Sequence, residues 1–123
     1  MKMVKVLIVD DQEPFRSAAR MVVELTEGFE VVGEAETGEK GVELAASLQP
    51  DLVLIDINMP GIDGLEATRQ ITAARPETRV VVFSTYEPTE YLSRAREAGA
   101  IDFIPKSEFD PISLVSTWES ASQ

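Results

Sequence analysis

Short apolar runs alternate along the whole chain with segments in which apolar residues recur at helical spacing. A continuous apolar run of about four to eight residues is typical of a strand buried on both faces of a parallel sheet. Apolar residues three and four positions apart are typical of a helix that packs one face on such a sheet. The pattern predicts strands over residues 4–9, 30–36, 52–56, 79–84 and 100–104.

Cap and turn residues predict the helices between these strands. Pro14 suits a first helical turn, and Asp63 and Glu66 have the spacing of a capping box. Asp110-Pro111 suits the start of the last helix. The expected helices cover approximately residues 14–26, 37–49, 63–75, 88–99 and 110–119. In the first helix, the residues expected to face the core are Phe15, Ala18, Ala19, Val22 and Val23.

Five strand–helix pairs in succession predict an α/β domain with one parallel sheet, because right-handed crossovers place helices on both of its faces. Pro105 cannot donate a ladder hydrogen bond, so the fifth strand is expected at an edge of the sheet. Charged residues in the second strand suit the other edge. The sequence therefore predicts a single doubly wound (βα)5 domain with strand order 2-1-3-4-5. It is expected over residues 1–119, with a polar tail over 120–123.

The composition excludes several classes of function. With 123 residues, 44% of them hydrophobic, the chain is expected to form one core. It has no cysteine and no histidine, which excludes disulfides, thiolate or imidazole metal ligands and Ser-His-Asp catalysis. A net charge of −11 argues against direct binding of nucleic acid. No apolar run approaches the roughly 18 residues that cross a membrane, so a cytoplasmic protein is expected.

Chemically active side chains gather where four of the predicted strands end. Asp10 and Asp11 follow the first strand, Asp56 ends the third, Ser84 ends the fourth and Lys106 follows the fifth. The carboxyl ends of parallel strands meet at one edge of the sheet, where open α/β sheets bind ligands. Each residue also has a purely structural explanation, as a helix cap, the start of a turn or a solvated lysine. Their convergence on one edge is what indicates a site.

Three carboxylates at one edge repel one another, which favours protonation of one of them or binding of a cation. Oxygen ligands favour a hard cation, so Mg2+, or Mn2+ in its place, is the expected cofactor. A carboxylate can attack phosphorus to give an aspartyl phosphate, and this step requires mainly alignment and charge neutralisation. With Asp56 as acceptor, the cation, the Lys106 ammonium and the Ser84 hydroxyl would stabilise the phosphoryl oxygens.

Several segments together resemble the receiver domains of bacterial two-component response regulators over essentially the whole chain. These segments are Val9-Asp10-Asp11, residues 56–64, Val82-Phe83-Ser84-Thr85 and residues 98–106. The resemblance implies the flavodoxin-like fold of that family, for which the strand order 2-1-3-4-5 is already known. Asp10-Asp11-Gln12 and Phe15-Arg16 are similar to the subgroup that often carries a C-terminal helix-turn-helix domain of the LuxR/NarL type.

The resemblance also implies roles in phosphoryl transfer. Asp56 would accept phosphate from a sensor histidine kinase or a phosphotransfer protein. Asp11, Asp56 and the backbone carbonyl of Asn58 would bind Mg2+, with Asp10 acting mostly through bound water. The protein would act as a phosphoacceptor rather than as a conventional enzyme. It would be a monomer or a phosphorylation-dependent homodimer, and an unknown output protein or C-terminal DNA-binding domain would respond to it.

A conformational switch is implied as well. Ser84 would be drawn to the phosphoryl group, and Phe103 would rotate into the vacated space, which would change the surface of the fourth helix, fifth strand and fifth helix. Tyr86 would control the access of water to the phosphoryl group, or simply cover the loop. Two positions depart from the family pattern, because Ser107 replaces a frequent proline and Phe103 a frequent tyrosine. A cis bond before Ser107 would cost about 2.5–4 kcal/mol.

Three other functions need different residues. A phosphatase of the haloacid dehalogenase type needs a second aspartate two positions after the nucleophile, where Asn58 stands. A flavodoxin would bring its flavin phosphate close to Asp10 and Asp11, which repel it. A phosphorylation-independent adaptor has no need of the acceptor-site residues, and it is retained as the alternative hypothesis.

Overall fold

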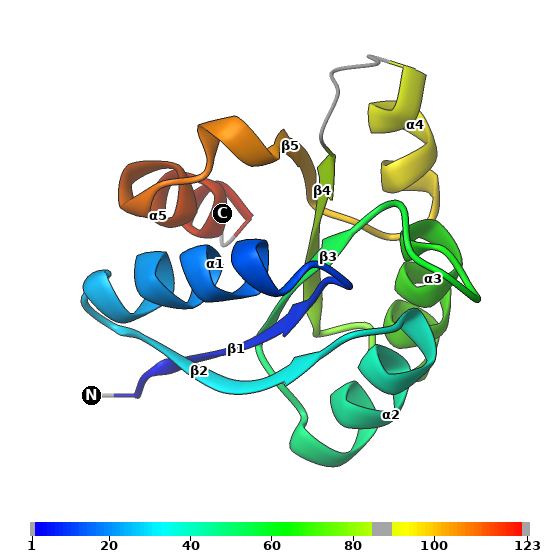
Figure 1. The fold of residues 1–123 in the computed structure, drawn as a ribbon, viewed down its shortest axis with the longest axis horizontal. Coiled ribbons are helices and arrows are strands. Elements are labelled where there is room, and N and C mark those ends of the chain that lie inside the picture. The colour runs from blue at the N-terminus through cyan, green and yellow to red at the C-terminus, as the bar shows by residue number, and fades with distance from the viewer. Residues whose placement is uncertain (1, 85–89, 122–123) are drawn as a thin grey trace.

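The chain folds into one five-stranded parallel sheet with helices on both faces (Figure 1). The computed structural model describes residues 2–84 and 90–121. The strand order is β2-β1-β3-β4-β5, which confirms the predicted order. The strands are β1 (Val4–Val9), β2 (Phe29–Ala35), β3 (Leu52–Asp56), β4 (Arg79–Ser84) and β5 (Asp102–Pro105).

Two groups of helices cover the sheet. Helices α1 and α5 lie on one face, and α2, α3 and α4 lie on the other (Figure 1). The α-helices are α1 (Glu13–Leu25), α2 (Gly38–Leu48), α3 (Gly64–Ala74), α4 (Glu90–Glu97) and α5 (Pro111–Ala121). A short 3-10 helix, η1 (Lys106–Glu108), was not predicted from the sequence. Within the described ranges, none of the helices has the length and apolar content needed to cross a bilayer.

The core consists of two apolar layers, one on each face of the sheet. Along β1, Leu7 and Val9 pack toward α2 and α3, while Val6 and Ile8 pack toward α1 and α5. All four side chains are fully buried. Because successive residues of a strand point to opposite faces, a strand covered on both sides is apolar throughout. This burial holds the strands rigidly and therefore fixes the position of the polar residues at their ends.

The fifth strand begins two residues later than predicted. The Ala100 amide donates a hydrogen bond to the Ala95 carbonyl at 2.9 Å, so Ala100 completes the end of α4 instead of starting β5. Ladder pairing with β4 begins at Asp102. The edge position expected from Pro105 is confirmed, since Pro105 is the last residue of β5 and pairs with Ser84.

Two further details differ from the sequence prediction. Ala18 was expected to face the core but is exposed, because α1 turns Arg16, Ala19 and Val23 toward the sheet. The Arg16 side chain, which was not among the expected core residues, is therefore buried. Helix α5 continues to Ala121, two residues into the predicted polar tail, where no proline or glycine interrupts it. The expected start of the fourth helix at Pro88 lies outside the described residues.

Side-chain caps begin three of the helices where the sequence predicted them. Thr37 accepts a hydrogen bond from the Lys40 amide, and Asp63 accepts one from the Glu66 amide at 2.8 Å. The capping box at Asp63 is only half formed, because the Glu66 carboxylate bonds Arg69 and Gln70. At α5, the Asp110 carboxylate accepts from the Ser113 amide at 2.7 Å, and the Ser113 hydroxyl accepts from the Asp110 amide at 3.0 Å.

Gly64 brings the start of α3 against the end of β3. A Cβ atom at this position would overlap the Asp56 carbonyl oxygen, so a side chain would push the helix away from the strand. The Gly64 amide donates a hydrogen bond to the Ile57 carbonyl at 2.9 Å. The loop between Asp56 and α3 is therefore short, and the Gly64 hydrogen bond fixes its C-terminal end against the end of β3.

The only tryptophan of the chain, Trp118, lies at the amino edge of the sheet. Its indole packs edge-on against the ring of Phe29, the first residue of β2, with ring centres 6.2 Å apart. The guanidinium of Arg79, the first residue of β4, lies 4.5 Å from the centre of the indole ring. These contacts attach the C-terminal half of α5 to the sheet at the end opposite Asp56.

Candidate functional site

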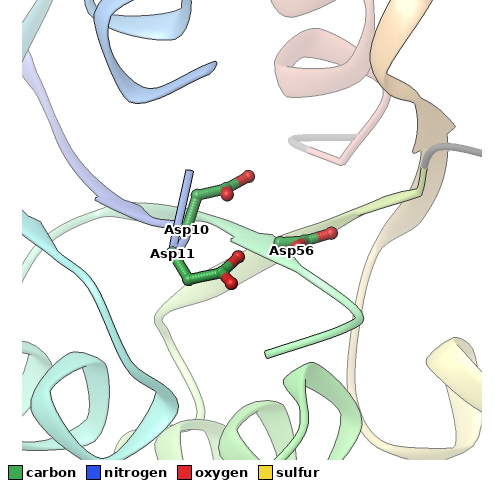
Figure 2. A group of neighbouring side chains, drawn as sticks. All are labelled: Asp10, Asp11 and Asp56. Atoms are coloured by element: carbon green, nitrogen blue, oxygen red, sulfur yellow. The ribbon is translucent and has the colours of Figure 1, made fainter. Parts of the chain in front are cut away.

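Four strands deliver the predicted site residues to the carboxyl edge of the sheet. Asp10 and Asp11 directly follow β1, and Figure 2 shows them beside Asp56, the last residue of β3. Ser84 is the last residue of β4, and Lys106 directly follows β5. Parallel strands in the order β1-β3-β4-β5 bring these ends together, as the sequence analysis expected.

The three aspartates form one acidic cluster. Each offers a carboxylate oxygen, and these oxygens all lie within 4.8 Å of one another. Asp10 and Asp56 are only 1% and 5% exposed, whereas Asp11 is open to solvent. Two buried carboxylates and one exposed carboxylate at this spacing repel one another unless a positive charge lies between them.

The Lys106 side chain supplies such a positive charge. Its Nζ lies 2.8 Å from Oδ2 of Asp10 and 3.6 Å from Oδ1 of Asp56. The Lys106 side chain is only 13% exposed, so water screens these ion pairs weakly. All peptide bonds are trans within the described residues, including the bond between Lys106 and Ser107. The ammonium thus lies between the two buried carboxylates without unusual backbone geometry.

Burial raises the pKa of Asp56 to about 6, from an ordinary value of 3.8. The second cause in the same direction is the charge of Asp10, and the Asp11 charge adds to it. The Lys106 ammonium and a backbone hydrogen bond from Asn58 lower the pKa and offset part of the rise. Asp56 is therefore mostly ionised at neutral pH, although less firmly than an exposed aspartate.

The start of α1 holds Asp10 in place. The Gln12 amide donates a hydrogen bond to Oδ1 of Asp10 at 2.8 Å. The Arg16 guanidinium donates one to the Asp10 backbone carbonyl at 2.7 Å, and it also pairs with Glu34 of β2 at 3.5 Å. These contacts fix both the backbone and one oxygen of Asp10, so its second oxygen points into the acidic cluster.

The acidic cluster suits a hard divalent cation. Within the part of the chain that the structure describes, no hydrogen bond reaches the buried Oδ2 of Asp10, although Lys106 lies close to it as an ion pair. A buried oxygen of this kind is favourable only when a cation or donor approaches it. Carboxylate oxygens are the ligands that Mg2+ prefers in proteins, and one or two are sufficient when water completes the shell. The donor set therefore fits the expected cofactor.

The remaining predicted residues occupy the rim of the site. Asn58 is exposed in the loop that leaves Asp56. Ser84 is buried at the end of β4, with 3% of its surface exposed. Phe103 is half-buried in β5 and packs against the apolar layer that faces α2 and α3. Tyr86 lies outside the described residues.

Sequence reasoning gave Gln12, Phe15 and Arg16 no part in the site. The Lys106 Nζ lies 4.6 Å from the centre of the Phe15 ring and 3.4 Å from Oε1 of Gln12. The signal that could have found these residues is their position in the first helical turn after Asp10-Asp11, at the same edge of the sheet.

Comparison with known proteins points to a single family. Residues 6–119 match the model of the response regulator receiver domain. The chain is 42% identical over 104 residues to Response regulator GacA of Pseudomonas aeruginosa, a match that covers 85% of this chain and 49% of that protein. The chain spans about half the length of the curated relatives that it matches.

Solved structures share the fold over nearly the whole chain. A two-component response regulator of the LuxR family from Aurantimonas is similar with a TM-score of 0.88 and 31% identity, covering 98% of this chain and 85% of that one. The CheX–CheY–BeF3–Mg2+ complex from Borrelia burgdorferi contains a chain with a TM-score of 0.84 and 27% identity, covering 97% and 89%. The relatives include a LuxR-family regulator, in agreement with the predicted subgroup.

Proposed function

The chain belongs to the response regulator receiver domain family, and from that membership we propose that Asp56 accepts a phosphoryl group from a histidine residue of a partner. Receiver domains are signalling modules of two-component systems, and this chain is one of them. The observation that supports the proposal most is the position of the Lys106 ammonium between Asp10 and Asp56. A lysine in that position can neutralise charge on a phosphoryl group at Asp56.

In the proposed transfer, an oxygen of the ionised Asp56 carboxylate attacks the phosphorus of a phosphohistidine. The P–N bond of the donor breaks, its electron pair returns to the imidazole, and an acyl phosphate forms on Asp56. Lys106 stabilises a phosphoryl oxygen through its ammonium, and the Ser84 hydroxyl donates a hydrogen bond to another. Because the pKa of Asp56 is about 6, the carboxylate is available as the nucleophile at neutral pH.

Mg2+ is the proposed cofactor of this transfer. Asp11, Asp56 and the backbone carbonyl of Asn58 would hold it, with Asp10 acting mostly through bound water. When bound, the cation supplies positive charge that offsets the charge of the phosphoryl oxygens. Asp10 and Asp11 help to orient the Asp56 carboxylate for the transfer. Water later hydrolyses the acyl phosphate, which returns Asp56 to its starting state.

The proposed response to phosphorylation involves Ser84 and Phe103. Ser84 moves toward the phosphoryl group, and Phe103 rotates and alters the surface formed by α4, β5 and α5. A phosphoryl group shifts this equilibrium only by its different interaction with the two conformations. A sensor histidine kinase or phosphotransfer protein would be the donor, and an output protein or DNA-binding domain would respond to the altered surface.

The wider context is also proposed from the family. The match covers about half the length of the curated relatives, and we propose that the chain is either a stand-alone regulator or the receiver unit, over residues 1–119, of a regulator with a LuxR/NarL-type helix-turn-helix domain. We also propose a cytoplasmic location, and either a monomer or a homodimer that forms on phosphorylation. Tyr86 keeps its proposed role in controlling access of water to the phosphoryl group.

Intact mass measurement tests the assignment of Asp56. Incubation with acetyl phosphate and Mg2+ is expected to add one phosphoryl group to the parent protein, and hydroxylamine is expected to remove it because it cleaves acyl phosphates. Asp56→Asn removes the nucleophile and is expected to abolish the addition. Asp51→Asn serves as the matched control, because Asp51 lies just before the other end of β3, where it accepts a hydrogen bond from the Lys5 amide.

The two possible failures have different meanings. Persistent labelling of the Asp56→Asn protein would show that another residue accepts the phosphoryl group. An unlabelled parent protein, with Mg2+ present and the fold intact, would favour the alternative of a phosphorylation-independent adaptor.

A further inference from the structure

We propose that Phe15 is a positioning residue for Lys106: the face of its ring holds the ammonium beside Asp56 and thereby sets the rate of phosphoryl uptake. The effect on rate rests on the proposed function, whereas the contact between ring and ammonium does not. Nothing in the chemistry of phosphoryl transfer itself requires an aromatic side chain at this position, so the inference comes from the geometry around Lys106.

Four polar or aromatic groups lie close to the Lys106 ammonium in the described residues. Two are the carboxylates of Asp10 and Asp56, at 2.8 and 3.6 Å, and the third is Oε1 of Gln12 at 3.4 Å. The fourth is the face of the Phe15 ring, whose centre lies 4.6 Å from Nζ. A cation within about 6 Å of a ring centre is attracted by the negative face of the ring, most strongly where water is excluded.

The Phe15 ring is itself held in a fixed orientation. It meets the ring of Phe83 edge-on, with centres 5.3 Å apart and planes at 64°. Phe83 is fully buried and also contacts Phe109, with ring centres 4.9 Å apart. In the sheet, Phe83 pairs with Asp56. The support for the Phe15 ring therefore comes from the strand next to the acceptor residue, which ties the position of the ring to that of Asp56.

A neutral aromatic face is suited to positioning this ammonium. The two carboxylates compete for Lys106, and Asp10 makes the shorter contact. A third carboxylate near the ammonium would draw it further from Asp56, whereas the ring attracts it without adding negative charge. Phe15 thus restricts the ammonium to the space beside Asp56, where charge develops on a phosphoryl group. A cation–π contact of ordinary strength changes such an equilibrium by about threefold to tenfold.

Three variants separate the aromatic face from simple packing. Phe15→Leu keeps an apolar side chain but removes the ring, and Phe15→Tyr keeps the ring. Phe109→Leu is the matched control, because the Phe109 ring also packs on Phe83, whereas it is the Phe15 ring that lies against the Lys106 ammonium. The only contact that Phe109 is described to make with Lys106 is between backbone groups, from its amide to the Lys106 carbonyl at 3.3 Å, and the substitution leaves both groups in place. With acetyl phosphate and saturating Mg2+, labelling of Phe15→Leu is expected to slow by about threefold to tenfold. Phe15→Tyr and Phe109→Leu are expected to stay within about twofold of the parent protein.

Nuclear magnetic resonance measures the contact without any phosphodonor. The chain has only four lysines, at positions 2, 5, 40 and 106, so lysine-selective 13C labelling gives a simple spectrum in which Lys106→Arg identifies the Lys106 signals. Protons above a ring face are shielded. In the parent, Phe15→Tyr and Phe109→Leu proteins, the signals of the Lys106 ε-protons are therefore expected upfield of the ε-proton signals of the other lysines. In folded Phe15→Leu they are expected to return to the position of a solvated lysine.

Each result supports or overturns the inference. Unchanged Lys106 signals in folded Phe15→Leu would show that the ring does not hold the ammonium. A changed spectrum with an unchanged labelling rate would show that the contact does not affect phosphoryl uptake. Slowing of Phe109→Leu as much as Phe15→Leu would assign the effect to packing. If the parent protein takes up no phosphoryl group, the proposed function fails, while the spectrum still reports on the contact.

Discussion

At the scale of single residues, two opposing groups of effects set the pKa of the Asp56 carboxyl group. Burial and the neighbouring Asp10 raise its pKa, whereas Lys106 and the Asn58 backbone lower it, and the result is a pKa of about 6. An acceptor carboxylate that is too easily protonated would lose its nucleophilicity near neutral pH. One that was fully solvated would lack the contact with Lys106 that, in the proposed function, stabilises the phosphoryl group.

The raised pKa predicts a pH-dependent effect of Asp56→Asn on stability. Since the pKa of Asp56 rises on folding from 3.8 to about 6, its contribution to folding is complete below the unfolded value and is lost as pH rises through the folded one. Without divalent cations, Asp56→Asn is expected to be more stable than the parent protein at about pH 7.5, by roughly 1–2 kcal/mol after allowance for solvent screening. The advantage is expected to shrink toward about pH 4, where Asp56 of the folded parent protein is protonated and, like asparagine, carries no charge.

Urea unfolding at a series of pH values, in the presence of a chelator, measures this difference directly. The Asp51→Asn protein controls for the loss of one charge at the other end of β3. A constant difference between the Asp56→Asn and parent proteins across the pH range would contradict the raised pKa.

The sequence predicted where the site lies better than how its side chains meet. Asp10, Asp56 and Lys106 were predictable because strand ends of a parallel sheet share an edge. The contact of Lys106 with Gln12 joins residues 94 positions apart, and it depends on the direction that a long side chain takes at the start of an unpredicted 3-10 helix. Nor could the sequence show that the face of the Phe15 ring lies against Lys106. An aromatic residue on the apolar side of a helix usually packs in the core and has no further role.

At the scale of elements, the cap of α5 offers a direct measurement of local stability. Asp110 and Ser113 exchange hydrogen bonds between side chain and backbone in both directions. Asp110→Ala removes one of these bonds and is expected to lower the free energy of unfolding by about 1 kcal/mol. Asp110→Asn keeps an oxygen that can accept from the Ser113 amide, so it is expected to lie within a few tenths of 1 kcal/mol of the parent.

Urea unfolding of the two Asp110 variants gives the comparison. Equal losses in the alanine and asparagine proteins would show that the Asp110 charge, rather than the cap, stabilises the start of α5.

The limits of sequence prediction at this scale follow from hydrogen bonding. Ala100 and Ile101 are apolar and follow a glycine, so they resemble the start of a buried strand. The Ala100 amide decides otherwise, since it donates its hydrogen bond back to α4, and the Ile101 amide is the first to bond β4, at the Val80 carbonyl. Hydrogen bonding also explains why the charged Arg16 faces inward. Its guanidinium donates to the Asp10 carbonyl and pairs with Glu34. Partners of this kind lie in other elements and leave no periodic trace in the sequence.

At the scale of the whole molecule, a net charge of −11 on 123 residues opposes the compact state by self-repulsion. Monovalent salt screens this repulsion. With a chelator present to exclude divalent cations, the thermal unfolding midpoint is expected to rise by a few degrees between low salt and about 0.5 M KCl. Differential scanning calorimetry measures the change. A midpoint that falls with salt would show that ion pairs such as Arg20–Glu34 outweigh the repulsion.

The tryptophan between Phe29 and Arg79 gives the molecule a single tryptophan fluorophore, at the far end of the sheet from Asp56. Its emission depends on whether α5 packs on β2 and β4, so the emission reports on that packing. A quenching titration that followed this signal while phosphodonor was added would report on α5 and not directly on events at the acidic cluster. A fluorophore introduced near Asp11 would be needed to observe them.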